Sequence, residues 1–297
     1  FTREKLYEKI VDRNSYEVKE INNWKDNTYS DFENLSEIKK IDFIHNEGVD
    51  SYSYLFIPQK SNNRLLIFHQ GHRGSFKNSK ETLKFFNEKG YYILAYQMPL
   101  LGSNPGILNS RGELQKNHEL LIKFNTHEKS FIYLFTTPIV LGIDHINKSM
   151  EFDSISMVGI SGGGWTTVLT SAVDLRINYS FPVAGSLPIA LRTYDIADIE
   201  NFHKPFYSEF SYLDLYLLGS TGKNRAQVQM NILRDNCCYS GGRSTLYSSY
   251  LSNLSDNLGG KFLTNIFDGD LHKIYKDQSE FIHKKIEEWT LKQKKSL

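Results

Sequence analysis

The chain has 297 residues, of which 40% are hydrophobic and 13% aromatic, enough for one large α/β domain or two smaller ones with a substantial core. Its formal net charge is +1 and its acids and bases are mixed along the chain, which gives no electrostatic case for nucleic-acid binding. No apolar run approaches the roughly 18–20 residues of a membrane span, so no transmembrane segment is expected.

The first residue bears only slightly on the compartment of the protein, and the two cysteines do not decide it. The chain begins with Phe1 rather than Met, so we expect a processed or truncated product, which slightly favours a secreted or envelope protein. Cys237 and Cys238 are adjacent and are the only cysteines, so they provide neither a disulfide framework nor a tetrahedral metal site. A disulfide between these neighbours and a pair of reduced, buried thiols are both open, so cysteine usage does not decide the compartment.

The N-terminal part of the chain differs in character from the rest. Residues 1–37 are highly charged with scattered apolar side chains, and they predict an extension of one or two helices packed outside the main domain. Residues 38–297 predict that main domain. It begins with apolar and polar residues in alternation over 38–43 and 52–56, which predicts a hairpin with its turn at 46–48.

From residue 64 onward, continuous apolar runs alternate with helical patterns. Such runs are typical of strands buried on both faces, and the alternation indicates a mostly parallel central sheet with helices on both faces. We therefore expect an α/β fold with the hairpin at the edge of the sheet. The expected strands are 64–68, 91–96, 154–158, 177–184, 227–233 and 262–267, and the expected helices are 79–88, 131–146, 165–173, 246–254 and 279–291.

Residues 187–225 interrupt this alternation. The segment is long and rich in aromatic residues, and it contains Pro188 and Pro205. We expect it to be a cap inserted into the domain, and we name it the cap segment. Its aromatic side chains are expected either to line an acyl pocket or stack on sugar rings, or simply to pack the cap segment onto the body. They are Tyr194, Phe202, Phe206, Tyr207, Phe210, Tyr212 and Tyr216.

The most informative stretch is 154–165, where an apolar strand leads into a glycine-rich turn and the start of a helix. Residues 159–163 are Gly-Ile-Ser-Gly-Gly and fit G-x-S-x-G, the nucleophile elbow. In such a turn Ser161 stands at a strained bend, and the residues two before and two after it crowd one another. Gly159 and Gly163 meet the resulting need for minimal side chains. A phosphate-binding loop is disfavoured, because no Lys-Ser or Lys-Thr pair follows.

With this motif between a strand and a helix, residues 38–297 resemble the α/β-hydrolase superfamily of serine esterases, lipases and peptidases. In that family the order is nucleophile, acid, histidine, with the acid after a late strand and the histidine after the last one. The resemblance implies that Ser161 is the nucleophile and that His272, on the loop beyond the last strand, is the general base. It implies that Asp235, two residues past the strand 227–233, is the acid.

Other residues fit these positions less well. His283 is the next candidate for the base, but it falls inside the last expected helix and is expected to be exposed. Asp195 and Asp214 belong to the cap segment and are less favoured as the acid. Asp268 and Asp270 are too near the histidine in the chain, and we expect them to form turns.

The oxyanion hole of this family uses two backbone N–H donors. Gly162, directly after the nucleophile, is the expected first donor. The second donor is expected from the loop after the first buried strand, whose sequence is His-Gln-Gly-His. This sequence departs from the family's His-Gly-rich form, so Gln70 and Gly71 are both candidates for the second donor. The next residues, His72 and Arg73, are expected either to contact substrate at the mouth of the site or to lie on a solvated loop.

These residues predict a serine hydrolase that cleaves a carboxylic ester of a small molecule, glycan or lipid through an acyl-enzyme intermediate. A peptidase or amidase and an acyltransferase use the same triad and are the alternatives within enzymes. A non-catalytic binding protein of the same fold is the rival class, disfavoured because serine, acid and histidine occur in the expected order. The sequence has no metal or dinucleotide motif, so neither a metal nor a cofactor is expected. The oligomeric state is left open.

Overall fold

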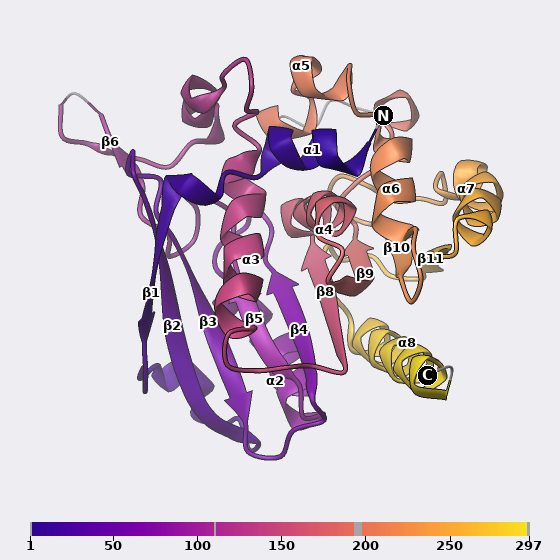
Figure 1. The fold of residues 1–297 in the computed structure, drawn as a ribbon, viewed down its shortest axis with the longest axis horizontal. Helices are drawn as coiled ribbons and strands as arrows, with labels where there is room; N and C mark the ends of the chain where they lie inside the picture. The colour runs from indigo at the N-terminus through magenta and orange to yellow at the C-terminus, as the bar shows by residue number, and fades with distance from the viewer. Residues whose placement is uncertain (1, 110, 193–197, 296–297) are drawn as a thin grey trace.

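The computed structural model describes residues 2–109, 111–192 and 198–295, and Figure 1 shows a central sheet with helices around it. Among these residues nine strands share one sheet in the order β1-β2-β3-β5-β4-β8-β9-β10-β11, and β6 and β7 form a separate pair. The strands are β1 (Tyr16–Ile21), β2 (Leu35–His45), β3 (Ser51–Pro58), β4 (Arg64–His69), β5 (Tyr92–Tyr96), β6 (Ile107–Leu108), β7 (Leu114–Gln115), β8 (Ser154–Ile160), β9 (Ile177–Val183), β10 (Ala226–Ile232) and β11 (Lys261–Phe267). The α-helices are α1 (Arg3–Ile10), α2 (Lys80–Glu88), α3 (Tyr133–Ile146), α4 (Gly162–Val173), α5 (Lys204–Tyr207), α6 (Tyr212–Ser220), α7 (Thr245–Asn257) and α8 (Lys276–Lys295).

The sheet is antiparallel at one edge and parallel over the rest. Strands β1, β2, β3 and β5 pair antiparallel with one another in that order. Each further pair, from β5 and β4 to β10 and β11, is parallel. The expected mostly parallel sheet, with its antiparallel hairpin at the edge, is therefore confirmed. Parallel strands end at the same edge of a sheet, so the loops after β4, β8, β10 and β11 meet there.

The central strands are buried because helices cover both faces of the sheet. Every residue of β8 and of β10 is buried. One cluster of buried apolar side chains includes residues of α1, α3, α4 and α6, and a second cluster includes residues of α2 and α8. In Figure 1 helix α3 crosses in front of the sheet. Each fully buried large apolar side chain contributes about 1.5–3 kcal/mol, so the apolar runs of the sequence account for this core.

The N-terminal extension differs from its prediction. The sequence predicts one or two helices over residues 1–37. In the described part of this stretch the structure has α1, and β1 adds an edge strand to the sheet. Within β1, half-buried side chains alternate with exposed ones, as expected of a strand with one face covered. Its partner β2 is eleven residues long and offers its free edge, which explains why this charged stretch is a strand.

The cap segment contains α5, α6 and two short 3₁₀ helices, at Ile189–Leu191 and Ile199–Asn201 (η6). Tyr194 and Asp195 lie outside the described residues. Four of the aromatic side chains are buried in the same apolar cluster as residues of α4, and they pack the cap segment onto the body of the domain, the simpler of their two expected roles. These four are Phe206, Phe210, Tyr212 and Tyr216.

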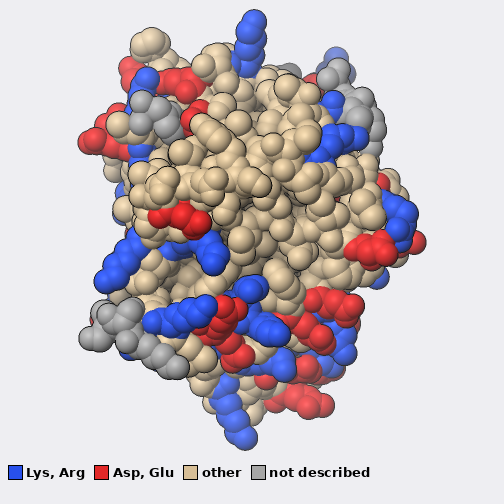
Figure 2. Space-filling view, turned by 90° about the vertical axis from the view of Figure 1, so that its right-hand side faces the viewer, with Lys and Arg blue, Asp and Glu red and all other residues tan. Residues whose placement is uncertain are grey.

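The surface carries charges of both signs. On the face drawn in Figure 2, acidic and basic side chains mix in the lower part, and a broad area above them is almost without charge. Among the described residues, no helix combines the length and the apolar character needed to cross a membrane.

Candidate active site

Ser161 lies at the turn between β8 and α4, with φ of 58° and ψ of −128°. A positive φ is unfavourable for a residue with a side chain, so this backbone is strained. Two hydrogen bonds hold it: the Ser161 N–H donates to the Val183 carbonyl, and the Trp165 N–H donates to the Ser161 carbonyl, both at 3.0 Å. This is the strained strand-to-helix turn that the motif predicts.

Two glycines make this turn sterically feasible. A Cβ atom on Gly159 would lie 2.1 Å from the carbonyl oxygen of Gly163, and a Cβ atom on Gly163 would lie 2.0 Å from the carbonyl oxygen of His69. Both distances are far below van der Waals contact, so any larger residue would displace the strand or the helix. The close approach explains why the motif has glycine two residues before and two residues after Ser161.

Asp235 and His272 lie together on the loops that follow β10 and β11. His272 Nδ1 is 2.8 Å from Asp235 Oδ2 and 3.0 Å from Oδ1. The Asp235 side chain is fully buried, and that of His272 is 7% exposed. Two further bonds shape the loops, because the Cys237 N–H donates to Asp235 Oδ1 at 2.9 Å and the His272 N–H donates to Asn236 Oδ1 at 3.0 Å. With its Nδ1 proton held by the carboxylate, a neutral His272 presents a lone pair at Nε2.

The Nε2 atom of His272 is buried and has no hydrogen-bond partner among the described residues. His272 and Ile160, the residue before Ser161, line one cavity of about 680 Å³. His272 and the strand end that leads into the nucleophile turn therefore border the same space, which has room for a substrate. The structure thus brings the three predicted residues, Ser161, Asp235 and His272, to the carboxyl ends of the parallel strands.

The two cysteines lie in the same loop as Asp235. Cys237 and Cys238 are joined by a disulfide, which decides between the two alternatives left open by the sequence. Since the Cys237 N–H donates to the Asp235 carboxylate, the bonded pair is part of the loop that holds the acid.

The weaker candidates have other partners. Asp214 caps the start of α6, Asp268 forms an exposed ion pair, and Asp270 accepts a hydrogen bond from a tyrosine hydroxyl. The expected exposure of His283 is wrong: its side chain is only 16% exposed and lies 3.0 Å from the hydroxyl of a buried tyrosine. The reason is that α8 turns this residue toward α2 and the sheet, so it is far less accessible than its helical position suggests.

The loop after β4 passes directly beside the nucleophile turn. A Cβ atom on Gly71 would lie 2.6 Å from the Ser161 Cβ and 3.1 Å from the Gly162 nitrogen. The Gln70 N–H already donates to the Tyr96 carbonyl at 2.9 Å, whereas the Gly71 N–H has no hydrogen bond within the described part of the chain. Of the two candidates for the second oxyanion donor, this geometry favours Gly71.

His72 and Arg73 face different cavities. Arg73 lines the cavity of about 680 Å³ together with His272. His72 points toward the cap segment, where its Nε2 is 2.6 Å from Glu200 Oε1 and 3.6 Å from Asp198 Oδ1. It borders a second cavity of about 380 Å³. Of these two candidates for substrate contact, only Arg73 shares the cavity of His272.

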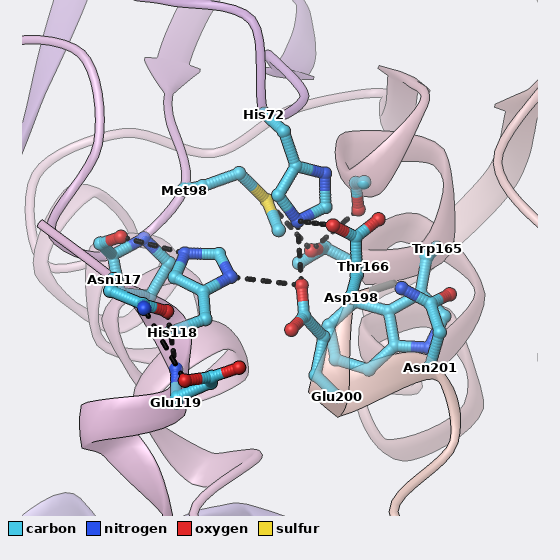
Figure 3. A network of polar contacts seen from close by, with 12 residues as sticks. His72, Met98, Asn117, His118, Glu119, Trp165, Thr166, Asp198, Glu200 and Asn201 are labelled. Carbon is cyan, nitrogen blue, oxygen red and sulfur yellow. Dashed lines mark hydrogen bonds and ion pairs between the residues drawn. The ribbon is translucent and has the colours of Figure 1, made fainter. Parts of the chain in front are cut away.

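Figure 3 shows a polar cluster around Glu200 that sequence reasoning missed. His118, at the start of the 3₁₀ helix His118–Phe124 (η4), has its Nδ1 3.0 Å from the same Glu200 oxygen that His72 contacts. Burial raises the pKa of Glu200, but the two histidines outweigh it and hold that pKa below its usual range. Burial lowers the pKa of His72, and the hydrogen bond to Glu200 outweighs it, so the net pKa is raised. The three residues are far apart in the sequence, so no spacing motif links them.

No protein-family model matches the chain, and no curated protein matches it. Among solved structures, it is similar to an acetyl xylan esterase from Paenibacillus sp. R4, with a TM-score of 0.65 and 15% identity over 96% of this chain and 91% of that chain. It is also similar to the methylesterase BT1017, with a TM-score of 0.66 and 16% identity over 95% of this chain and 60% of that chain. It is similar as well to acetyl xylan esterase 1 from Thermoanaerobacterium sp. JW/SL YS485, with a TM-score of 0.59 and 15% identity over 95% of this chain and 90% of that chain. The chain has the α/β-hydrolase fold, as the sequence predicts.

Proposed function

We propose that this chain, which has the α/β-hydrolase fold, is a serine hydrolase that cleaves carboxylic esters. The observation that carries the proposal is the buried Asp235–His272 pair, in which Nε2 has no partner among the described residues and His272 lines the same cavity as Ile160, the residue before Ser161. A histidine held by a carboxylate at one nitrogen and unpaired at the other is arranged to accept a proton from a nearby hydroxyl. The positive φ of Ser161 supports its assignment as that hydroxyl.

The proposed reaction has two steps. Ser161 Oγ attacks the acyl carbonyl while His272 Nε2 takes its proton, and Asp235 stabilises the imidazolium that forms. The N–H groups of Gly162 and Gly71 stabilise the negative charge on the carbonyl oxygen. His272 then protonates the leaving alcohol. In the second step His272 takes a proton from water, which attacks the acyl-enzyme, and His272 then returns this proton to Ser161 Oγ as the carboxylic acid leaves.

We propose a short acyl group on a polar carrier such as a glycan as the substrate. Most of the residues that line the cavity beside His272 are polar or charged, and their side chains could form hydrogen bonds with sugar hydroxyls. Two of the similar structures named above are acetyl xylan esterases, which supports this choice of substrate class. The cavity residues that would contact the carrier are Arg73, Asn78, Lys273, Lys276 and Asp277.

Hydrolysis assays on matched substrates test this proposal. p-Nitrophenyl acetate and acetylated xylan should be hydrolysed. p-Nitrophenyl palmitate, with its long acyl chain, should react far more slowly, and so should the anilide in which an amide replaces the ester of p-nitrophenyl acetate. Ser161→Ala should lower turnover by roughly 10⁴–10⁶-fold without unfolding the protein, whereas the control Ser208→Ala, at an exposed serine, should keep full activity. Near-normal turnover by Ser161→Ala would contradict the proposal. Faster cleavage of the anilide would instead indicate an amidase, and ester formation with an added alcohol would indicate an acyltransferase.

A further inference from the structure

We propose that His72, His118 and Glu200 form a binding site for a divalent metal ion, with zinc the ion that fits best. The sequence predicts no metal, because these three residues come from separate segments and form no local ligand motif. The proposal does not depend on the proposed hydrolase activity, since metal binding is measured without any substrate.

The three side chains converge on one point. His72 Nε2 and His118 Nδ1 lie 2.6 Å and 3.0 Å from the same oxygen, Glu200 Oε1. One ligand atom from each residue can be chosen so that all lie within 4.8 Å of one another. Figure 3 shows both imidazole rings turned toward the carboxylate. Two imidazole nitrogens and a carboxylate oxygen are a ligand set typical of zinc.

The hydrogen bonding of His118 leaves its Nδ1 available as a ligand atom beside Glu200. Its Nε2 is 2.9 Å from the carbonyl oxygen of Pro99, which can only accept, so Nε2 carries a proton. In the neutral ring Nδ1 is then a lone pair, and it faces a carboxylate oxygen at 3.0 Å. Two acceptors this close need a positive charge between them, either a second ring proton or a metal ion. Histidines that bind metals commonly donate their other N–H to a backbone carbonyl, as His118 does.

Glu200 supplies the second, independent observation. It is fully buried, and its other carboxylate oxygen, Oε2, has no hydrogen-bond partner among the described residues. A buried carboxylate oxygen without a partner is unfavourable, because it has lost its contact with water. A metal ion bound to this carboxylate would compensate for that loss, whereas the two histidines as they stand contact only Oε1.

The charge balance also suits a divalent ion. Asp198 Oδ1 is 3.6 Å from His72 Nε2, so the cluster contains two carboxylates beside two imidazoles. With both histidines neutral, one divalent ion brings the net charge of the cluster to zero. Asp198 is 34% exposed at its side chain and is the candidate for a fourth ligand. The cavity of about 380 Å³ is lined by His72, His118 and Asp198, so an ion and water can reach the cluster from outside.

The position of this site suggests that a bound ion would fix the His72 ring beside the nucleophile turn. His72 follows Gly71, and its ring lies so close to Gly162 that a Cβ atom there would be 2.5 Å from His72 Cε1. A bound ion would therefore connect the loop after β4, η4 and η6 of the cap segment, and would hold the His72 ring against the start of α4. Its cavity is separate from the one that His272 lines, so the ion is assigned no part in bond cleavage.

Zinc binding by the full chain tests the site. After treatment with a chelator, the protein is titrated with Zn²⁺ by calorimetry, and bound metal is counted by mass spectrometry after gel filtration. One equivalent should bind and raise the melting temperature. His118→Gln and Glu200→Gln should each weaken binding at least about tenfold, whereas His127→Gln, at an exposed histidine outside the cluster, should bind zinc normally.

Cobalt gives a second readout that requires no variant. Co²⁺ bound to wild-type protein should give intense visible absorption typical of tetrahedral coordination, and Zn²⁺ should remove it. Circular dichroism establishes that each variant is folded. A folded wild-type chain that binds no zinc would overturn the proposal, and so would binding that both His118→Gln and Glu200→Gln leave unchanged. Ser161→Ala should bind zinc like wild type, so a failure of the hydrolase proposal leaves this result unaffected.

Discussion

His272 Nδ1 lies 2.8 Å from Asp235 Oδ2, although 37 residues separate the two in the chain. The register of the sheet explains this contact. Strands β10 and β11 pair in parallel, with Ile232 opposite Phe267 at their ends. The two loops therefore start side by side, and each needs only a few residues to bring its side chain to the other.

The assignment of Asp235 leads to the first prediction. Asp235→Asn should lower kcat/KM on p-nitrophenyl acetate by roughly 10²–10⁴-fold, because an amide no longer holds the His272 tautomer that has its lone pair at Nε2. Asp214→Asn is the control and should be nearly as active as wild type, since Asp214 caps α6. Full activity in Asp235→Asn together with an inactive Asp214→Asn would place the acid in the cap segment.

A second prediction concerns Gly71. Gly71→Ala places a Cβ atom 2.6 Å from both the Ser161 Cβ and the Ile160 carbonyl oxygen, so the loop or the nucleophile turn must move. We expect a loss of kcat of at least about 10²-fold, the effect of losing one oxyanion donor. The matched control is Gly242→Ala, whose Cβ would meet only the flexible end of Ile266, at 3.1 Å. Equal activity of the two variants would contradict the close packing of Gly71 against the nucleophile turn, on which its assignment to the oxyanion hole rests.

The third prediction concerns stability against pH. Burial is the main cause that lowers the pKa of His69 from 6.5 to about 4. At a pH between these two pKa values, His69 is protonated in the unfolded chain but not in the folded one. The free energy of unfolding therefore falls as the pH falls through this window. The contribution of His69 is about 3 kcal/mol over the window. It is measured by urea unfolding at pH 7 and pH 4.5.

A comparison of variants isolates this contribution. His69→Gln should lose part of the pH dependence, whereas His127→Gln, at an exposed residue, should keep the wild-type dependence. An unchanged pH dependence in His69→Gln would show that other groups cause the acid destabilisation, such as His45 and His203, whose pKa values burial also lowers.

The fourth prediction tests the role of the cap aromatics. Phe206 is fully buried against the body of the domain, so Phe206→Ala should lower the free energy of unfolding by about 3–5 kcal/mol. The preference of the Phe206→Ala enzyme among substrates of different acyl chain length should stay that of the wild type. Leu246→Ala, at a residue 72% exposed, is the control and should change stability by less than about 0.5 kcal/mol. A stable Phe206→Ala that accepts longer acyl chains would indicate an acyl pocket instead.

Local patterns account for what the sequence predicts well. The glycines around Ser161 are required by contacts within a few residues and with one neighbouring loop, so the motif alone indicates the turn. The central strands are buried on both faces of the sheet, so short continuous apolar runs rather than an alternation indicate them. The family resemblance places Asp235 and His272 after two late strands, and these strands pair in parallel, so their loops start at the same edge of the sheet.

Features that depend on distant partners could not be predicted in this way. Strand β1 is highly charged and becomes a strand because β2 offers a free edge, which no local pattern shows. The cluster of His72, His118 and Glu200 forms only when the cap segment folds onto the loop after β4. The choice of Gly71 over Gln70 depends on a single bond from Gln70 to Tyr96 across the sheet.

The most direct test of the central claim is the site of covalent labelling by a fluorophosphonate. Intact-protein mass spectrometry should show one adduct on the wild-type chain, and peptide mapping should place it on Ser161. Ser161→Ala should carry no adduct, whereas Ser208→Ala should be labelled like wild type. An adduct that persists in Ser161→Ala, or a folded wild-type chain that is not labelled at all, would contradict the assignment of Ser161 as an activated nucleophile.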